Sequence, residues 1–252
     1  METIACQKCE TLNKKSAKYC RSCGTLITGI HHKKRVSYLN RIIAFYVLMI
    51  VFFGVSHFIF EAFPFNFAVE LGVETFFILL VIGFAATEFK AIAPLYKAPK
   101  IPTQIIVLAI LFPVFTAFSV SYGMNWIEEN VLPDFEVTNY VSEYFYVDNV
   151  LFWSIFLVAI LPPIFEELAF RGYLYEVVSK VASEKMTIVA TAALFALAHF
   201  SFLSVIWIFP FGLFLGYLRK RYNTLWLPML VHFIHNFIVV MIDYHDYNNG
   251  FF

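Results

Sequence analysis

Cysteine is absent from residues 24–252 of this chain, because all four cysteines fall within the first 23 residues. A disulfide-stapled domain beyond that point is therefore excluded. Charge is also scarce, since Asp, Glu, Lys and Arg make up 14% of the residues and balance to a formal net charge of zero. Without a basic excess there is no general electrostatic attraction to nucleic acid, and no nucleic-acid partner is predicted.

Apolar residues are abundant instead. They make up 60% of the chain and include 31 phenylalanines, whereas a soluble domain is about 45–50% apolar. One soluble core cannot bury this surplus, so lipid must be part of the solvent. The predicted fold class is an all-α, polytopic membrane helix bundle over residues 41–252. Seven apolar runs approach the length of about 20 residues that a transmembrane helix needs, at about 41–61, 69–88, 102–122, 150–170, 187–203, 204–218 and 224–242.

The connections between these runs alternate in charge. A basic linker at residues 30–40 precedes the first run, and every second connection after it carries Lys or Arg, including Arg171 and Arg219. The other connections, 62–68 and 125–149, carry neither, nor does the tail. Because Lys and Arg concentrate in cytoplasmic loops, we expect a multi-pass protein with a cytoplasmic N-terminus and an external or interfacial loop at 125–149.

The cysteines form two CxxC pairs within residues 1–29. Each pair can turn tightly enough to offer two thiolates to one ion, and two pairs complete a tetrahedral zinc site. Four cysteine ligands leave no open position, so this zinc is expected to be structural. The module resembles short zinc ribbons at the N-termini of many bacterial and archaeal membrane proteins, which favours a prokaryotic plasma membrane and a possible protein partner for the ribbon. Its predicted ligands are Cys6, Cys9, Cys20 and Cys23.

Ionisable residues inside membrane helices are costly and are functional candidates. Glu167 and Arg171 are four apart and can pair on one helix face, which leaves Glu166 free to address the bundle interior. Simpler interpretations also exist: Glu167 and Arg171 as a structural ion pair, His199 as a hydrogen-bonded core histidine, and His235 as a packing residue. Three clusters occur, namely Glu166, Glu167 and Arg171 in ILPPIFEELAFRGYLY, Phe195 and His199 in LFALAHF, and His232, His235 and Asn236 in LPMLVHFIHNF.

Taken in order, EExxxR, FxxxH and HxxxN over about residues 100–242 resemble the CPBP family (CAAX proteases and bacteriocin-processing enzymes, also called Abi), which are intramembrane endopeptidases. The resemblance implies a catalytic set drawn from these motifs and a membrane-anchored peptide or protein as substrate. His235 lies outside the family pattern, and the N-terminal ribbon is an addition to it. The implied catalytic residues are Glu166, Glu167, Arg171, His199, His232 and Asn236.

Two chemical versions remain open. In the first, Glu166 is the general base that activates a water molecule, with His232 and Asn236 binding the oxyanion and His199 positioning the water or relaying a proton. In the second, Glu166, His199 and His232 hold a catalytic zinc. The absence of an HExxH pair slightly favours the first. Two other functions fit the composition: a non-catalytic scaffold or immunity factor of the same fold, or a proton-coupled transporter.

Overall fold

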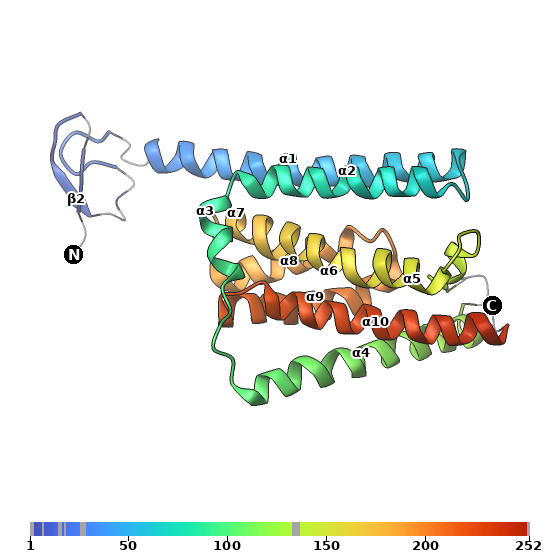
Figure 1. Cartoon of the computed structure of the whole chain (residues 1–252). Helices are drawn as coiled ribbons and strands as arrows, with labels where there is room; N and C mark the ends of the chain where they lie inside the picture. Colours follow the sequence, from blue (N-terminus) through green and yellow to red (C-terminus); the bar gives the residue numbers. More distant parts are fainter. Residues whose placement is uncertain are drawn as a thin grey trace.

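The computed structural model describes residues 3–6, 8–14, 17, 19–25, 29–132 and 137–250. Parts of the expected ribbon (1–2, 7, 15–16, 18 and 26–28) and residues 133–136 of the expected external loop lie outside the described residues. The chain forms a small two-stranded module followed by a helical bundle whose long helices run roughly parallel or antiparallel (Figure 1). The all-α membrane bundle expected from composition is confirmed.

The N-terminal module is built from two similar turns. Strand β1 (Thr3–Ala5) pairs antiparallel with β2 (Leu12–Lys14). After Cys6, the N–H of Glu10 donates to the Cys6 carbonyl at 2.8 Å, and after Cys20 the N–H of Gly24 donates to the Cys20 carbonyl at 3.0 Å. Glu10 and Gly24 both have positive φ, at 56° and 67°. The two CxxC segments therefore adopt the same turn, which needs a left-handed residue directly after the second cysteine.

Within the described residues, six helical segments are long and apolar enough to cross a membrane. The segment expected as a basic linker, 30–40, is helical and continuous with α1. The fourth segment is one helix of changing register, made of α5 (Val150–Ser154), η3 (Ile155–Ile160), α6 (Leu161–Glu167), η4 (Leu168–Leu174) and α7 (Tyr175–Ser179). The other long helices are α1 (Gly29–Ala62), α2 (Phe67–Ala86), α4 (Thr103–Asn130), α9 (Phe202–Tyr222) and α10 (Trp226–Asn249). Short helices connect them: α3 (Phe89–Ile92), η1 (Ala93–Tyr96) and η2 (Ser142–Tyr144).

The fifth expected span, 187–203, is a shorter helix, α8 (Glu184–Leu197), which is not among the six segments long enough to cross a membrane. It has 14 residues, or about 21 Å at 1.5 Å per residue. It stops early because Ser201 caps the next helix, with its Oγ accepting a hydrogen bond from the Ser204 N–H at 3.3 Å. Helices α8 and α9 thus form a hairpin, and the N- and C-termini lie at opposite ends of the bundle (Figure 1).

Two arginines that were counted as loop charges lie inside the protein. The fourth helix continues to Ser179 rather than ending at 170, and Arg171 is fully buried in it. Arg219 is also buried, near the end of α9. Burial of both arginines is possible because each forms an ion pair, Arg171 with Glu167 and Arg219 with Glu176. The α2–α4 and α7–α8 connections keep lysines, and Lys220 lies in the last turn of α9; all three places are at the ribbon end of the bundle (Figure 1).

The helical hairpin of α1 and α2 is fastened to the rest of the bundle at that same end. Glu88, just after α2, accepts from Arg41 Nη1 of α1 and from Lys180 Nζ just after α7, each at 2.7 Å. Further along, the buried rings of Phe45 and Tyr173 lie 5.0 Å apart between α1 and η4. Toward the opposite end the hairpin leaves space beside α6, and this space borders the predicted site.

Candidate active site in the membrane bundle

The fourth helix is irregular on both sides of the glutamate pair. Pro162 and Pro163 lie in the first turn of α6, between two π-helical segments, η3 before it and η4 after it. Proline lacks the N–H that continues a helix, and a π-turn takes up an extra residue. The side chains of Glu166 and Arg171 are therefore not spaced as on a regular α-helix.

Glu167 is the centre of a buried polar network. Its Oε1 accepts from Arg171 Nη1 at 2.9 Å and from His232 Nδ1 at 3.0 Å, and none of its side chain is exposed. Arg171 donates from Nη2 to the Gly212 carbonyl at 3.1 Å, and its guanidinium lies 4.2 Å from the centre of the Phe195 ring. The predicted i,i+4 ion pair is confirmed, and it is joined by a histidine from a distant helix.

The contact with Glu167 fixes the orientation of His232. A carboxylate only accepts hydrogen bonds, so Nδ1 of His232 carries the proton, and Nε2 of the neutral ring presents a lone pair. That Nε2 lies 4.0 Å from Oε2 of Glu166, too far for a direct hydrogen bond. A single water molecule at about 2.8 Å from each atom can contact both groups.

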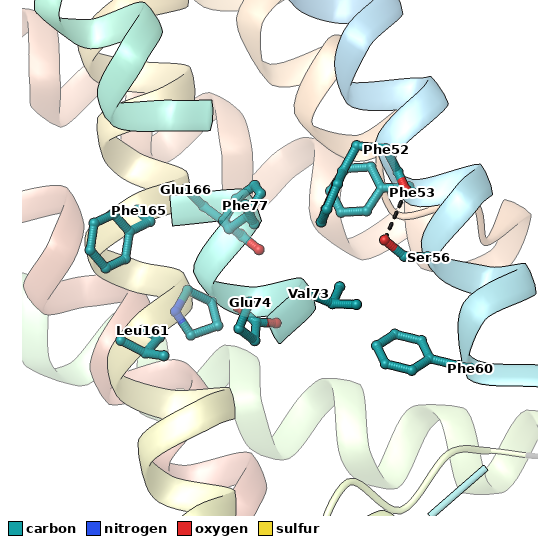
Figure 2. Close-up of a pocket in the computed structure, with 11 residues that line it drawn as sticks. Phe52, Phe53, Ser56, Phe60, Val73, Glu74, Phe77, Leu161, Phe165 and Glu166 are labelled. Atoms are coloured by element: carbon teal, nitrogen blue, oxygen red, sulfur yellow. Dashed lines mark hydrogen bonds between the residues drawn. The ribbon is translucent and has the colours of Figure 1, made fainter. Parts of the chain in front are cut away.

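Glu166 faces two adjoining cavities between the α1–α2 hairpin and the fourth helix. The larger, about 390 Å³, is lined by Glu166 and His199 together with His57 of α1. The smaller, about 160 Å³, is lined by Glu166 and by Glu74 of α2. Figure 2 shows the carboxylate ends of these two glutamates directed toward the phenylalanines of α1. The expectation that Glu166 addresses an interior space agrees with this geometry, although Glu167 is the more deeply buried of the pair.

His199 lies on the rim of the larger cavity. It follows the end of α8 and is exposed, and its Nδ1 is 2.9 Å from the Phe195 carbonyl. A carbonyl also only accepts, so this histidine too presents Nε2 as its free nitrogen. The Phe195 ring packs edge-to-face on both imidazoles, with centroid distances of 4.9 Å to His199 and 6.0 Å to His232. The predicted FxxxH motif thus places one ring between two candidate histidines.

Asn236 and His235 point away from this centre. The Asn236 amide donates to the Val158 carbonyl of η3 at 2.9 Å. His235 Nδ1 lies 3.0 Å from Thr116 Oγ1 of α4, and its ring packs on Phe211 at 4.8 Å. The packing role expected for His235 agrees with these contacts, whereas one of the two amide hydrogens of Asn236, which was expected to face a substrate, is bonded to the backbone.

The cysteine module has the geometry of a metal site. The four Sγ atoms lie within 4.8 Å of one another, with Cys6 and Cys23 3.6 Å apart and Cys9 and Cys20 3.5 Å apart. These separations exceed the roughly 2.05 Å of a disulfide and approach the about 3.8 Å that tetrahedral 2.3 Å Zn–S bonds require. The four cysteines can therefore bind one metal ion.

The membrane site fits a metal less well. In the part of the chain that the structure describes, the four cysteines are the one group of three or more His, Cys, Asp or Glu residues whose ligand atoms lie within 4.8 Å of one another. Glu166, His199 and His232 are not brought that close, although both histidines have the tautomer that a metal ligand needs. The spacing therefore does not support the zinc version of the site as the side chains stand.

Sequence reasoning missed residues that shape the site from neighbouring helices. Gly212 and Gly216 of α9 lie against α8: a Cβ on Gly212 would be 3.2 Å from both Arg171 Nη2 and the Ala192 Cβ. The GxxxG spacing, which marks close helix packing in membranes, was the available signal. Glu74 of α2 lines the smaller cavity, but one glutamate in an apolar run does not reveal from the sequence which neighbouring helix it faces.

Comparison with known protein families identifies the same part of the chain. Residues 148–238 match a family model described as type II CAAX prenyl endopeptidase Rce1-like. No curated protein and no solved structure gives a significant match to the chain. The matched segment begins just before α5 and ends within α10, so it contains all six predicted site residues of the bundle. By these motifs and this match, residues 148–238 of the membrane bundle resemble the CPBP family, and the matching family model is Rce1-like.

Proposed function

We propose that this protein is an intramembrane endopeptidase that hydrolyses peptide bonds of membrane-anchored substrates with a water molecule activated by Glu166. The arrangement of His232 supports this best: it is held through Nδ1 by buried Glu167, and its Nε2 faces Glu166 beside a cavity. The family match supports proteolysis in general. The substrate's apolar anchor would lie against the phenylalanine-rich walls of the two cavities.

In this mechanism Glu166 removes a proton from water as the oxygen attacks the peptide carbonyl carbon. His232 Nε2 accepts a hydrogen bond from the second hydrogen of the water, which stays on the oxygen, and so orients the attacking lone pair. The protonated Glu166 then gives its proton to the leaving amine, which restores the carboxylate. Glu167 and Arg171 act by holding the imidazole in one tautomer. His199, on the cavity rim, is suited to guide the substrate carbonyl or the water.

The decisive variant is Glu166→Gln, which keeps the size of the side chain and removes the base. We expect the cleavage rate to fall by about 10²–10⁴-fold, measured with purified protein and a membrane-anchored peptide bearing a fluorophore and a quencher. Glu61→Gln is the matched control, because Glu61 is exposed at the end of α1 and lies outside both cavities. A Glu166→Gln protein that cleaves at the normal rate would rule out the proposed base.

The zinc version is tested in the same assay. Both histidines leave Nε2 free, which is the observation that keeps this version open. A chelator should leave cleavage unchanged in a Cys9→Ser/Cys23→Ser variant, whose ribbon can no longer contribute an ion. Loss of cleavage on chelation, with recovery on added zinc, would show that the membrane site itself needs a metal.

We also propose that the ribbon end of the bundle is cytoplasmic. The lysine-bearing connections gather at that end, and the opposite end carries acidic and aromatic segments, as the positive-inside tendency requires. A membrane-impermeant thiol reagent applied to intact cells should then leave the four cysteines unmodified unless the membrane is opened.

A further inference from the structure

The Val158 carbonyl, in the π-helical segment η3, cannot be satisfied by its own helix. In an α-helix its donor is the N–H four residues later, and in a π-helix five residues later. Those positions are Pro162 and Pro163, and neither has an N–H. The nearest preceding N–H, that of Leu161, donates to the Phe156 carbonyl. Two consecutive prolines thus remove both helical partners of one carbonyl.

A side chain from another helix supplies the missing donor. Asn236 of α10 donates from Nδ2 to the Val158 carbonyl at 2.9 Å. Inside a bundle surrounded by lipid, a backbone carbonyl without a donor is costly, because water is not available to replace it. Asn236 therefore supplies the hydrogen-bond donor that the two prolines of the fourth helix deny to the Val158 carbonyl.

This hydrogen bond lies next to the proposed catalytic groups on both helices. Asn236 is one turn after His232 on α10, and Pro162 is one turn before Glu166 on α6. One bond therefore joins the same two elements that must bring His232 Nε2 and Glu166 Oε2 to 4.0 Å. A slip of α10 along the fourth helix would separate them, and the bond to Val158 opposes that slip.

We propose that Asn236 is a positioning residue, which acts through the Val158 carbonyl freed by Pro162 and Pro163 and sets the register of α10 against α6. Its effect on turnover rests on the proposed function, whereas the coupling between Asn236 and the prolines does not. An asparagine that bound the oxyanion would behave differently, because its loss would lower turnover by the same factor whether or not the prolines were present.

The first test is a thermal-unfolding cycle on the purified full-length protein. Asn236→Ala should lower the unfolding midpoint, on the order of 2–8 °C for one unsatisfied buried carbonyl. In a P162A/P163A background, where a backbone N–H is available at both positions, the same substitution should lower it by less than half as much. In a P210A background, which returns an N–H to an exposed position of α9, the full drop should remain. If the P162A/P163A variant does not fold, P162A alone restores the α-helical donor.

The second test repeats the cycle with kcat and KM. Asn236→Ala should reduce kcat on the order of tenfold or more with little change in KM, and this factor should shrink in the P162A/P163A background. Equal unfolding drops in both backgrounds would overturn the proposal, and so would a thermal coupling accompanied by an unchanged kcat factor. If the unfolding midpoints show the coupling but the wild-type protein cleaves no substrate, the link between Asn236 and the prolines is supported and the proposed protease is refuted.

Discussion

Glu166 and Glu167 are adjacent but occupy opposite kinds of environment. Glu167 has no exposed side-chain surface and is bound by Arg171 and His232, whereas Glu166 has 22% of its side chain exposed and lies 4.0 Å from His232 Nε2. Removing one partner of a buried ion pair leaves an uncompensated charge, which costs about 3–5 kcal/mol. Replacing a carboxylate that faces a cavity leaves no such buried charge and does not carry this cost.

We therefore expect Glu167→Ala to lower the free energy of unfolding by about 3–5 kcal/mol, and Glu166→Ala to change it by less than about 1 kcal/mol. Both variants should lose peptide cleavage. Denaturant unfolding in detergent, followed by tryptophan fluorescence, measures the difference. Equal destabilisation by the two variants would contradict this assignment of roles.

The sequence predicted which residues meet at the site better than how they meet. The i,i+4 pairing of Glu167 with Arg171 follows from helical spacing, and the structure contains it. That Glu167, rather than Glu166, holds His232 does not follow, because two π-segments and two prolines change the angles between side chains along this helix. No sequence period describes such a helix, so the facing partners could be found only in three dimensions.

At the level of helices, α8 and α9 approach closely through Gly212 and Gly216. A Cβ on Gly212 would press on Ala192 and on the Arg171 guanidinium. We expect Gly212→Ala to cost about 1–3 kcal/mol of stability, as overpacking does, and to lower cleavage by displacing Arg171. Gly83→Ala of α2 is the matched control, because a Cβ there meets nothing within 4 Å. A Gly212→Ala protein as stable as Gly83→Ala would show that the helices can separate freely.

Glu88 fastens the α1–α2 hairpin through two cations. Burial raises its pKa, but the hydrogen bonds from Lys180 and Arg41 outweigh burial, so the pKa lies below its ordinary value of 4.5. A group whose pKa is depressed by folding adds stability above its unfolded pKa, and this stability is lost as pH falls through the folded value. The melting midpoint of wild type should therefore exceed that of Glu88→Gln at pH 6–7, with the gap closing below about pH 4. A gap that persists at lower pH would exclude this ion-pair contribution.

Helix existence was predictable from apolar runs, but helix ends were less so. Arg171 and Arg219 were placed in loops because a charged residue normally ends a membrane span. The structure keeps both inside, because each meets a glutamate and a backbone carbonyl. The end of α8 was placed several residues too late, at 203, because only His199 and Ser201 interrupt the apolar residues between α8 and α9.

For the whole molecule, the ribbon and the membrane site are separate chemical units. We expect the purified protein to carry one zinc ion per chain, and Cys6→Ser/Cys20→Ser to carry none, as measured by elemental analysis. His232→Ala and Glu166→Gln should keep the ion, because the four cysteines alone gather their ligand atoms in the described residues. Loss of zinc in either of these two variants would place a metal in the bundle.

The shortness of α8 has a consequence for the surrounding lipid. Its 14 residues cover about 21 Å, while the hydrocarbon of a bilayer is about 30 Å thick. His199 lies directly after this helix, beside the larger cavity. Acyl chains that contact α8 would shorten or tilt to match its length, at fractions of a kcal/mol per Å. We therefore expect a thinner hydrocarbon layer beside α8, where an anchored polypeptide would need to unwind fewer residues to bring its backbone to the glutamate.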